Sequence, residues 1–206
     1  MSRIFPMYVK LEGRSVLVVG AGKVAEGKIY GLLDTGAKIQ VIALRALARI
    51  KELASSGAIT LEERAFSPDD LDGVSLVIVA SSSSALNQTV FRESRARGIL
   101  CNVVDVPDLC DFYYPAVVQR GDLQIAISTG GQSPSLAQKL RLQLERQFGP
   151  GYSEWVRELG RTRRDVLRSD LQPEQKRFLL SSLASRQAFE EMLLAKRTQE
   201  QESEVA

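Results

Sequence analysis

The sequence predicts an α/β protein, in which a Rossmann-type domain on a parallel sheet precedes a small α+β segment and a C-terminal helical domain. Three observations predict this fold class. Short apolar runs alternate with helical patterns up to residue 104, a glycine motif joins the first run to the first helical pattern, and residues 152 onward carry helical patterns only. Such alternation of strands and helices is typical of a doubly wound sheet.

The first 104 residues contain five runs of strand length. The third run alternates and is weaker than the others; the five lie at residues 15–19, 39–43, 59–63, 76–80 and 100–104. Near-continuous apolar strands are typical of a parallel sheet that helices cover on both faces. Helices are expected between most of these strands, including residues 24–35 and 85–97.

The pattern changes after the fifth strand. Residues 116–120 and 123–127 have the composition of two further strands, and Gly121-Asp122 between them predicts a hairpin turn. A helix is expected over residues 136–147.

Gly149-Pro150-Gly151 then marks a boundary. The chain after it is charged and helical, with patterns at residues 153–167, 174–183 and 188–196. We therefore expect three domains, at residues 1–112, 113–150 and 151–206.

Composition excludes several classes of function. The 206 residues carry 27 Lys and Arg against 25 Asp and Glu, a formal net charge of +2, and no histidine. This near balance of charge points to neither nucleic acid nor a membrane surface as a partner. The lack of histidine excludes Ser-His-Asp triads and His-ligated zinc, so acid–base work must fall to a carboxylate, Lys, Tyr, Cys or hydroxyl.

The two cysteines and the apolar runs bear on the cellular compartment of the protein. Cys101 and Cys110 suit neither a disulfide framework nor a metal pair, so no metal site is expected. No apolar run has the length of a membrane span, and residues 1–8 lack the apolar core of a signal peptide. Two free thiols fit a reducing cytoplasm.

A dinucleotide fingerprint follows the first strand. Gly20, Gly22 and Ala25 give the pattern G-x-G-x-x-A at the point where a strand passes into a helix. The free N–H groups of the helix N-terminus suit the phosphates of a cofactor. The predicted cofactor-binding residues in this turn are Gly20, Ala21, Gly22, Lys23 and Val24. A tight strand–helix turn without a ligand is the alternative.

The acidic residue that usually holds the ribose is missing at the end of the second strand. Leu44 and Arg45 stand there instead. Arg45 would suit the 2′-phosphate of NADP, although a solvated loop residue is the favoured interpretation. Backbone groups near Leu44 and Arg45 are the predicted ribose contact.

Polar residues also follow the fourth and fifth strands. Ser81 begins a run of serines that either lines the cofactor or caps the next helix. Asp105 follows the fifth strand, and the carboxyl ends of parallel strands face the ligand crevice. Because the chain has no histidine, Asp105 is the leading candidate for a general base. Asp108 and Asp111 are close in sequence and remain alternatives, and a turn before Pro107 would also explain Asp105.

Four stretches of the chain, taken together, resemble one family. They read Pro-Met-Tyr-Val-Lys-Leu at residues 6–11, Val-Val-Gly-Ala-Gly-Lys-Val-Ala at 18–25, Cys-Asn-Val-Val-Asp-Val-Pro at 101–107 and Ser-Thr-Gly-Gly-Gln-Ser-Pro at 128–134. Their order and composition resemble the precorrin-2 dehydrogenase family, which forms the front module of siroheme synthases. The last two stretches are far more specific than the glycine motif.

The resemblance implies NAD-dependent oxidation of precorrin-2, a tetrapyrrole, to sirohydrochlorin. Some members of the family also insert ferrous iron. The resemblance further implies a homodimer, with residues 113–150 as the dimerisation segment, and it matches the family's aspartate to Asp105. The family uses NAD without the ribose acid, which weakens the NADP interpretation of Arg45.

A substrate with many carboxylates needs cationic contacts. Arg157 and Arg161 belong to a series, continued by Arg164 and Arg168, that shares one helix face. We expect Arg157 and Arg161 to bind the substrate. The alternative is a solvated face paired with Glu154 or Glu158.

Two further segments are candidates for substrate contact. Ser128, Thr129, Gly130 and Ser133 form a loop that either offers N–H groups and hydroxyls to an anion or caps the next helix. Asn102 either positions the substrate or nicotinamide or satisfies backbone groups at the strand end. Tyr113 and Tyr114 either stack on the macrocycle or make a dimer or inter-domain contact.

The chain departs from the family at Gly27, where the family usually carries Arg before the helix Lys, here Lys28. A glycine inside a helix costs about 1 kcal/mol relative to alanine, and a cation is lost. Different packing of the helix or the cofactor is therefore expected.

Two other functions compete with the dehydrogenase. A non-catalytic NAD-sensing module would use only residues 20–25 and would leave Asp105 with a structural role. A small-molecule reductase would use NADP through Arg45. Replacing Asp105 distinguishes the sensing module from the dehydrogenase, because only the dehydrogenase needs this side chain. Comparing the binding of NAD and NADP distinguishes the reductase from the dehydrogenase.

Overall fold

Residues 4–205 are described by the computed structural model, with side chains described up to residue 195. The chain divides between Tyr114 and Pro115 into two compact units. The first unit therefore ends two residues beyond the predicted residue 112. The further division at residue 150, into a dimerisation segment and a helical domain, stays a prediction.

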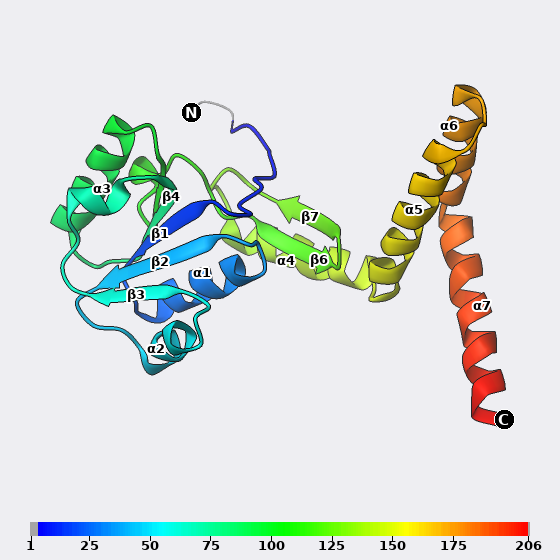
Figure 1. Cartoon of the computed structure of the whole chain (residues 1–206), viewed down its shortest axis with the longest axis horizontal. Helices are drawn as coiled ribbons and strands as arrows, with labels where there is room; N and C mark the ends of the chain where they lie inside the picture. The colour runs from blue at the N-terminus through cyan, green and yellow to red at the C-terminus, as the bar shows by residue number, and fades with distance from the viewer. Residues whose placement is uncertain (1–3, 206) are drawn as a thin grey trace. The chain divides into compact units, whose positions relative to one another are not determined.

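The first unit contains the predicted parallel sheet (Figure 1). Its five strands lie in the order β3-β2-β1-β4-β5. All neighbours are parallel, and Val18 of β1 lies between Val41 of β2 and Ile78 of β4. The strands span Ser15–Val19 (β1), Lys38–Ala43 (β2), Thr60–Glu63 (β3), Val74–Val79 (β4) and Leu100–Val103 (β5). The predicted fold class is confirmed.

Helices cover both faces of this sheet because its central strands are apolar on both sides. Val16 and Val18 pack in one core with α1 (Lys23–Leu33) and α2 (Ala48–Ser55). Leu17 and Val19 pack in the other core with α3 (Ser84–Ala96). These four β1 side chains are at most 2% exposed. Burial of β1 on both faces confirms that its continuous apolar run indicates a central parallel strand.

The carboxyl ends of β1, β4 and β5 are hydrogen-bonded beyond the strands themselves. The amide N of Ala80 lies 2.8 Å from the carbonyl O of Val19, and the amide N of Val104 lies 2.9 Å from the carbonyl O of Val79. After β1 the chain continues to β2 and β3 on one side of β1, and it then crosses to β4 and β5 on the other side. This reversal is the switch point at which open α/β sheets bind ligands.

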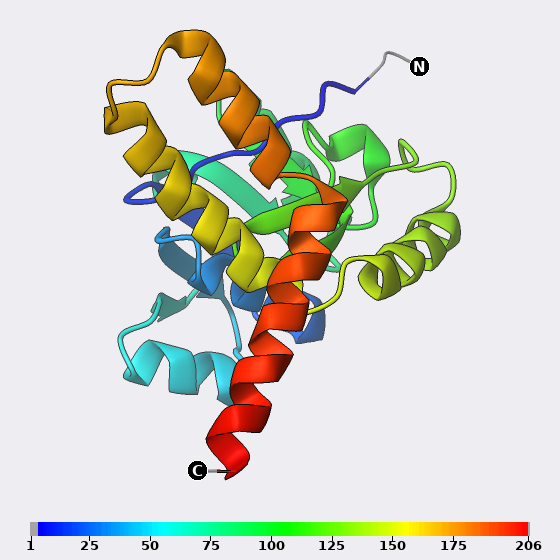
Figure 2. The same ribbon diagram turned by 90° about the vertical axis from the view of Figure 1, so that its right-hand side faces the viewer.

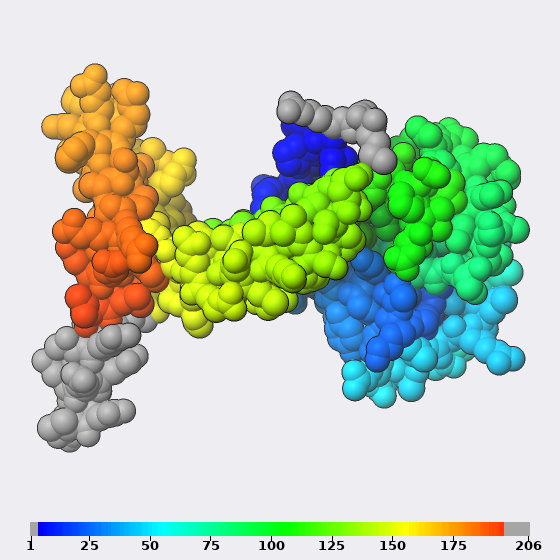
Figure 3. Space-filling view, turned by 180° about the vertical axis from the view of Figure 1, so that it is seen from behind, coloured from blue at the N-terminus to red at the C-terminus, as the bar shows by residue number. Residues whose placement is uncertain are grey.

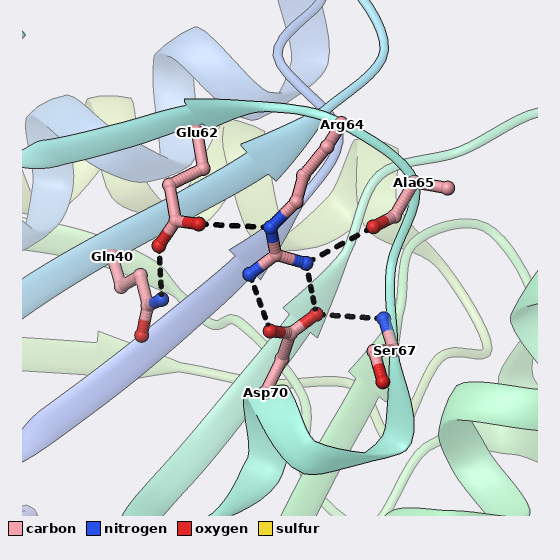
Figure 4. Close-up of polar contacts among 6 residues, drawn as sticks. All are labelled: Gln40, Glu62, Arg64, Ala65, Ser67 and Asp70. Atoms are coloured by element: carbon pink, nitrogen blue, oxygen red, sulfur yellow. Dashed lines mark hydrogen bonds and ion pairs between the residues drawn. The ribbon is translucent and has the colours of Figure 1, made fainter.

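A network of hydrogen-bonded charged residues lies at the end of the edge strand β3 (Figure 4). The Arg64 guanidinium donates to both carboxylate oxygens of Asp70, at 2.6 and 2.9 Å, and to Glu62 at 2.8 Å. Asp70 also accepts from the amide N of Ser67 at 2.7 Å, and its side chain is 7% exposed. The hydrogen bond from Arg64 lowers the pKa of Asp70, against the opposing effect of burial.

We expect Asp70→Asn to lower the free energy of unfolding by about 1–2 kcal/mol at neutral pH, because charge-assisted hydrogen bonds to a nearly buried carboxylate are lost. Since folding lowers this pKa, the stabilisation is complete above the unfolded pKa of about 3.9 and fades as pH falls below it. Urea unfolding from pH 7 to pH 3 tests this. Asp69→Asn, an exposed neighbour, is the matched control, and an equal loss in both variants would contradict the prediction.

The second unit begins with the predicted hairpin. Strands β6 (Ala116–Arg120) and β7 (Leu123–Ile127) pair antiparallel, and Gly121 between them has φ +58°. Helix α4 (Pro134–Gln147) packs against the hairpin and is drawn in yellow-green in the space-filling view (Figure 3). The Arg120 guanidinium fixes the end of α4 by donating to the carbonyls of Phe148 and Glu145, at 2.9 and 3.2 Å.

Three further helices complete this unit (Figure 2). They span Gly151–Arg168 (α5), Pro173–Leu183 (α6) and Arg186–Val205 (α7). The rings of Tyr152 and Phe189, 4.2 Å apart between centroids, join α5 to α7, and Trp155 packs on Phe189 at 4.9 Å. Over the described residues, the structure has no helix with the length and apolar character that crossing a membrane requires.

Candidate functional site

The turn between β1 and α1 has a conformation that only glycine accommodates. Gly20 has φ +111°, and its amide N donates to the carbonyl O of Ile42 at 2.8 Å. A Cβ at this position would lie 2.3 Å from the carbonyl O of Ala80. Gly20 is therefore required by the close approach of β1 and β4, before any ligand is considered.

The N-terminus of α1 is open to a ligand. Gly22 is the N-cap with no side-chain hydrogen bond, it is exposed, and a Cβ there would meet no atom within 4 Å. Lys23 and Val24 are also exposed, whereas Ala25 is fully buried against the sheet. An uncapped helix N-terminus beside open space fits the pyrophosphate of NAD. Ala21 is buried, and its carbonyl accepts from the amide N of Leu47 at 3.1 Å.

The end of β2 offers an apolar rather than an acidic contact. Leu44 is 76% exposed, an unusual position for a large apolar side chain at the edge of a crevice. Arg45 is exposed as well. Leu47, in the loop between β2 and α2, donates its amide N–H to the carbonyl of Ala21 in the glycine turn. The ribose contact at Leu44 and Arg45 stays a prediction.

The serine run after β4 is used largely within the fold. Ser83 caps α3 by accepting from the amide N of Leu86, and the Ser81 hydroxyl accepts from the amide N of Ser83 at 3.1 Å. The Ser81 carbonyl accepts from Nδ2 of Asn87 at 3.2 Å. Oδ1 of Asn87 is the one buried side-chain N or O atom without a partner in the part of the chain that the structure describes. The sequence interpretation overlooked Asn87, and a polar residue on the buried face of α3 is the signal that would have found it.

Asp105 is distinguished by its backbone. It has φ +63°, a left-handed conformation that no other described residue except glycine adopts, and its side chain is exposed. Aspartate tolerates this region better than most residues, but it remains costly. Strain of this kind tends to persist where a side chain must be aimed.

Lys28 contacts Tyr114, and the charge of Asp105 acts on it. Nζ of Lys28 lies 3.7 Å from the centroid of the Tyr114 ring, a cation–π contact. Desolvation lowers the pKa of Lys28, and attraction to Asp105 partly opposes this. Desolvation also raises the pKa of the Tyr114 hydroxyl above its usual range. Lys28 of α1 thus contacts the last residue of the first unit and is influenced by the charge at the end of β5, which the sequence interpretation did not foresee.

The other polar groups near the end of β5 are engaged in the fold. Asn102 is 6% exposed, and its Nδ2 donates to the carbonyl of Phe112 at 2.8 Å. This is the backbone-satisfying role that the sequence left open; contact of Asn102 with a substrate stays a prediction. Burial raises the pKa of Cys101 to about 12, consistent with a thiol in the core. Asp111 accepts from the amide N of Cys101 at 3.1 Å, which ties it to the fold more closely than Asp105.

The loop at residues 128–133 caps α4. The Ser133 hydroxyl accepts from the amide N of Leu136, and Oγ1 of Thr129 accepts from the amide N of Ser133 at 3.0 Å. The Ser128 hydroxyl accepts from the amide N of Gly130, which has φ +61°. The capping role is therefore present, and a substrate contact of this loop stays a prediction.

The arginine face of α5 is solvated. Arg157 and Arg161 are exposed, and Nη1 of Arg161 lies 3.0 Å from the Glu158 carboxylate. A substrate contact of these arginines stays a prediction. Over the described residues, the structure has no group of three or more Cys, Asp or Glu arranged to hold a metal ion.

The glycine at the family's arginine position lies on the exposed side of α1. Gly27 is exposed, and a Cβ there would meet no atom within 4 Å. This position faces away from the core, and the expected difference in packing of the helix or the cofactor stays a prediction.

We expect Gly27→Ala to raise the free energy of unfolding by about 1 kcal/mol, because alanine loses less backbone entropy in a helix. Gly57→Ala is the control: its Cβ would also meet open space, but Gly57 has φ +78°, so this variant should lose stability. Thermal unfolding of both variants checks the pair. A loss of stability in Gly27→Ala would contradict the assignment.

Two family models match the chain. A model of NAD(P)-binding domains matches residues 7–116, and the model described as sirohaem biosynthesis protein central matches residues 120–147. The siroheme synthase of Methylococcus capsulatus is 46% identical over 140 residues, which cover 68% of this chain and 30% of that protein. The siroheme synthase of Ectopseudomonas mendocina is 40% identical over 163 residues, or 79% and 35% of the two chains. The chain thus spans about a third of the length of these relatives.

A solved structure matches almost the whole chain. SirC, a precorrin-2 dehydrogenase, aligns with a TM-score of 0.80 at 28% sequence identity and covers 96% of this chain and 98% of its own. The match includes both units, so it extends beyond the likeness that dinucleotide-binding domains share.

Proposed function

The chain belongs to the precorrin-2 dehydrogenase family, whose members form the N-terminal module of siroheme synthases, and we propose that it oxidises precorrin-2 to sirohydrochlorin with NAD. The observation that carries this proposal is Asp105. It is exposed at the carboxyl end of β5 and held in a left-handed conformation, in a chain without histidine. The resemblance of residues 101–107 to the family matches it to the family's aspartate.

The chain's residues divide the work as follows. NAD, when bound, would accept the hydride that the substrate gives up. The turn at Gly20 and Gly22 binds the cofactor phosphates with the N-terminus of α1. Asp105 accepts the proton that leaves the substrate at the same oxidation, because an exposed carboxylate can reach it directly. Arg157, Arg161 and the loop at residues 128–133 are proposed contacts for substrate carboxylates.

We further propose that the protein acts as a homodimer in the cytoplasm. A two-stranded sheet is marginal on its own, and among the described residues β6 and β7 pair only with each other. A second copy that extends this sheet would satisfy the free edges. Cys101 and Cys110 are free thiols, which suits a reducing compartment.

Insertion of ferrous iron into the product is a further proposal for the same site. The proposal is supported by Asp105, since an exposed carboxylate can take the pyrrole protons that iron displaces. A non-catalytic NAD-sensing module is not favoured, because the match to a dehydrogenase covers 96% of the chain.

Anaerobic incubation of the purified protein with precorrin-2 and NAD tests the function. The expected result is sirohydrochlorin and NADH in equal amounts, followed by absorbance, with NADP as a poorer cofactor. Addition of ferrous iron then tests insertion against the protein-free rate. Binding of NAD without any turnover of precorrin-2 would contradict the proposed function and favour the sensing module.

A further inference from the structure

We infer that Lys28 binds a carboxylate of the tetrapyrrole substrate beside Asp105. This inference rests on the proposed function and deepens it, because it assigns a cation to a substrate whose carboxylates surround the ring. Lys28 lies in the middle of α1, and no sequence motif pointed to it as a ligand-binding residue.

The geometry places the ammonium group over the Tyr114 ring, and the charge of Asp105 also acts on it. Nζ of Lys28 lies 3.7 Å from the Tyr114 ring centroid, and the residue is half-buried. None of the ion pairs in the described part of the chain includes Lys28. The nearest acidic residue on its own helix, Glu26, is paired with Arg49 at 3.7 Å.

Lys28 has a π contact but takes part in no ion pair among the described residues, which leaves its charge available to an anion. A half-buried ammonium loses part of its hydration, and an anion or a π face compensates that loss. The Tyr114 ring supplies part of the compensation. Desolvation nevertheless outweighs the attraction of Asp105, since the pKa of Lys28 is lowered. A carboxylate arriving at Nζ would restore the balance, and Lys28 would gain a charge-assisted hydrogen bond.

Two considerations favour the substrate over the cofactor as the source of this anion. Lys28 lies six residues beyond Gly22, so its Cα is about 9 Å along the helix axis from the phosphate-binding N-terminus. Its ammonium lies over the Tyr114 ring instead. If Asp105 takes a proton from the substrate, the ring must lie next to Asp105, which brings the ring's carboxylates within reach of Lys28.

The test compares neutral and charged replacements. We expect Lys28→Gln to raise the KM for precorrin-2 about tenfold or more, the value of one charge-assisted hydrogen bond, with kcat and the KM for NAD changed less than about twofold. Lys28→Arg should recover most of the affinity. Lys28→Met is a second neutral variant whose apolar side chain suits the half-buried position. Lys38→Gln removes the same charge at the opposite end of the sheet, where β2 begins, and should match the wild type.

Direct binding of uroporphyrin, a porphyrin rich in carboxylates, separates this inference from the proposed function. Quenching of porphyrin fluorescence should give a Kd for uroporphyrin that is about tenfold higher for Lys28→Gln than for the wild type. Added salt should make these two Kd values more alike. This arm remains decisive if the wild type fails to oxidise precorrin-2. Equal uroporphyrin affinity in wild type and both neutral variants, no uroporphyrin binding by the wild type, or a larger effect on NAD than on the tetrapyrrole would each overturn the inference.

Discussion

Replacing Asp105 with asparagine is expected to lower kcat for precorrin-2 oxidation by about 100-fold or more, the usual contribution of a positioned general base. Asparagine has nearly the same shape and tolerates φ near +63° as well as aspartate does. The variant therefore removes the proton acceptor without adding backbone strain. Asp105→Ala is a less clean test, because a Cβ-bearing residue without a local polar group is disfavoured in this conformation.

The matched control for this variant is Asp108→Asn. Asp108 is also exposed and lies three residues away in the short turn Pro107–Leu109. It should keep nearly full kcat in the anaerobic assay with precorrin-2 and NAD. NAD binding by both variants, measured by calorimetry, should equal that of the wild type. Retention of more than a tenth of the wild-type kcat by Asp105→Asn would rule out Asp105 as the base.

The second large effect is expected at the two glycines of the fingerprint, which should fail in different ways. In Gly20→Ala the new Cβ would lie 2.3 Å from the carbonyl O of Ala80, at φ +111°. We expect a loss of stability on the order of 3 kcal/mol, because neither β1 nor β4 can move without disrupting the centre of the sheet. Gly22→Ala should fold normally, since its Cβ meets no protein atom and its φ is −89°.

The functional loss in Gly22→Ala should appear only with the cofactor. A Cβ at the N-cap would occupy the space through which a pyrophosphate approaches the backbone, so the Kd for NAD should rise about tenfold, or about 1.4 kcal/mol. Urea unfolding without ligand, together with NAD titration, separates the two variants. A Gly22→Ala variant destabilised as much as Gly20→Ala, or a stable Gly20→Ala, would contradict these assignments, since replacing the N-cap glycine by alanine costs about 1 kcal/mol at most.

Several elements were predictable because their signals are local. The apolar runs of β1, β2, β4 and β5 and the turn at residues 20–25 follow from side-chain pattern and from the backbone freedom of glycine. Helix α2 (Ala48–Ser55) was not foreseen, since it is short and largely exposed and buries only Ile50 completely. Helix α4 begins at Pro134, two residues before the expected start at residue 136, because the N-cap Ser133 precedes the first apolar residue of the helix.

The candidate site divides in the same way. Asp105 could be chosen from its place after a buried strand and from the absence of histidine, both visible in the sequence. Its left-handed backbone and the contact of Lys28 with Tyr114 could not. These residues come from segments far apart in the chain, and their separation in sequence carries no information on which side chains meet.

The sequence by itself determined the parallel sheet, the glycine turn and the family, because periodicity and short motifs depend on neighbouring residues. Only the tertiary structure decided which polar groups are already used by the fold. The Asn102 amide, the Ser133 hydroxyl and the Asp111 carboxylate are bound to backbone groups, whereas the half-buried Lys28 takes part in no ion pair among the described residues. The physical reason is that desolvation and hydrogen bonding depend on the three-dimensional surroundings of each group, which are set by packing between distant segments.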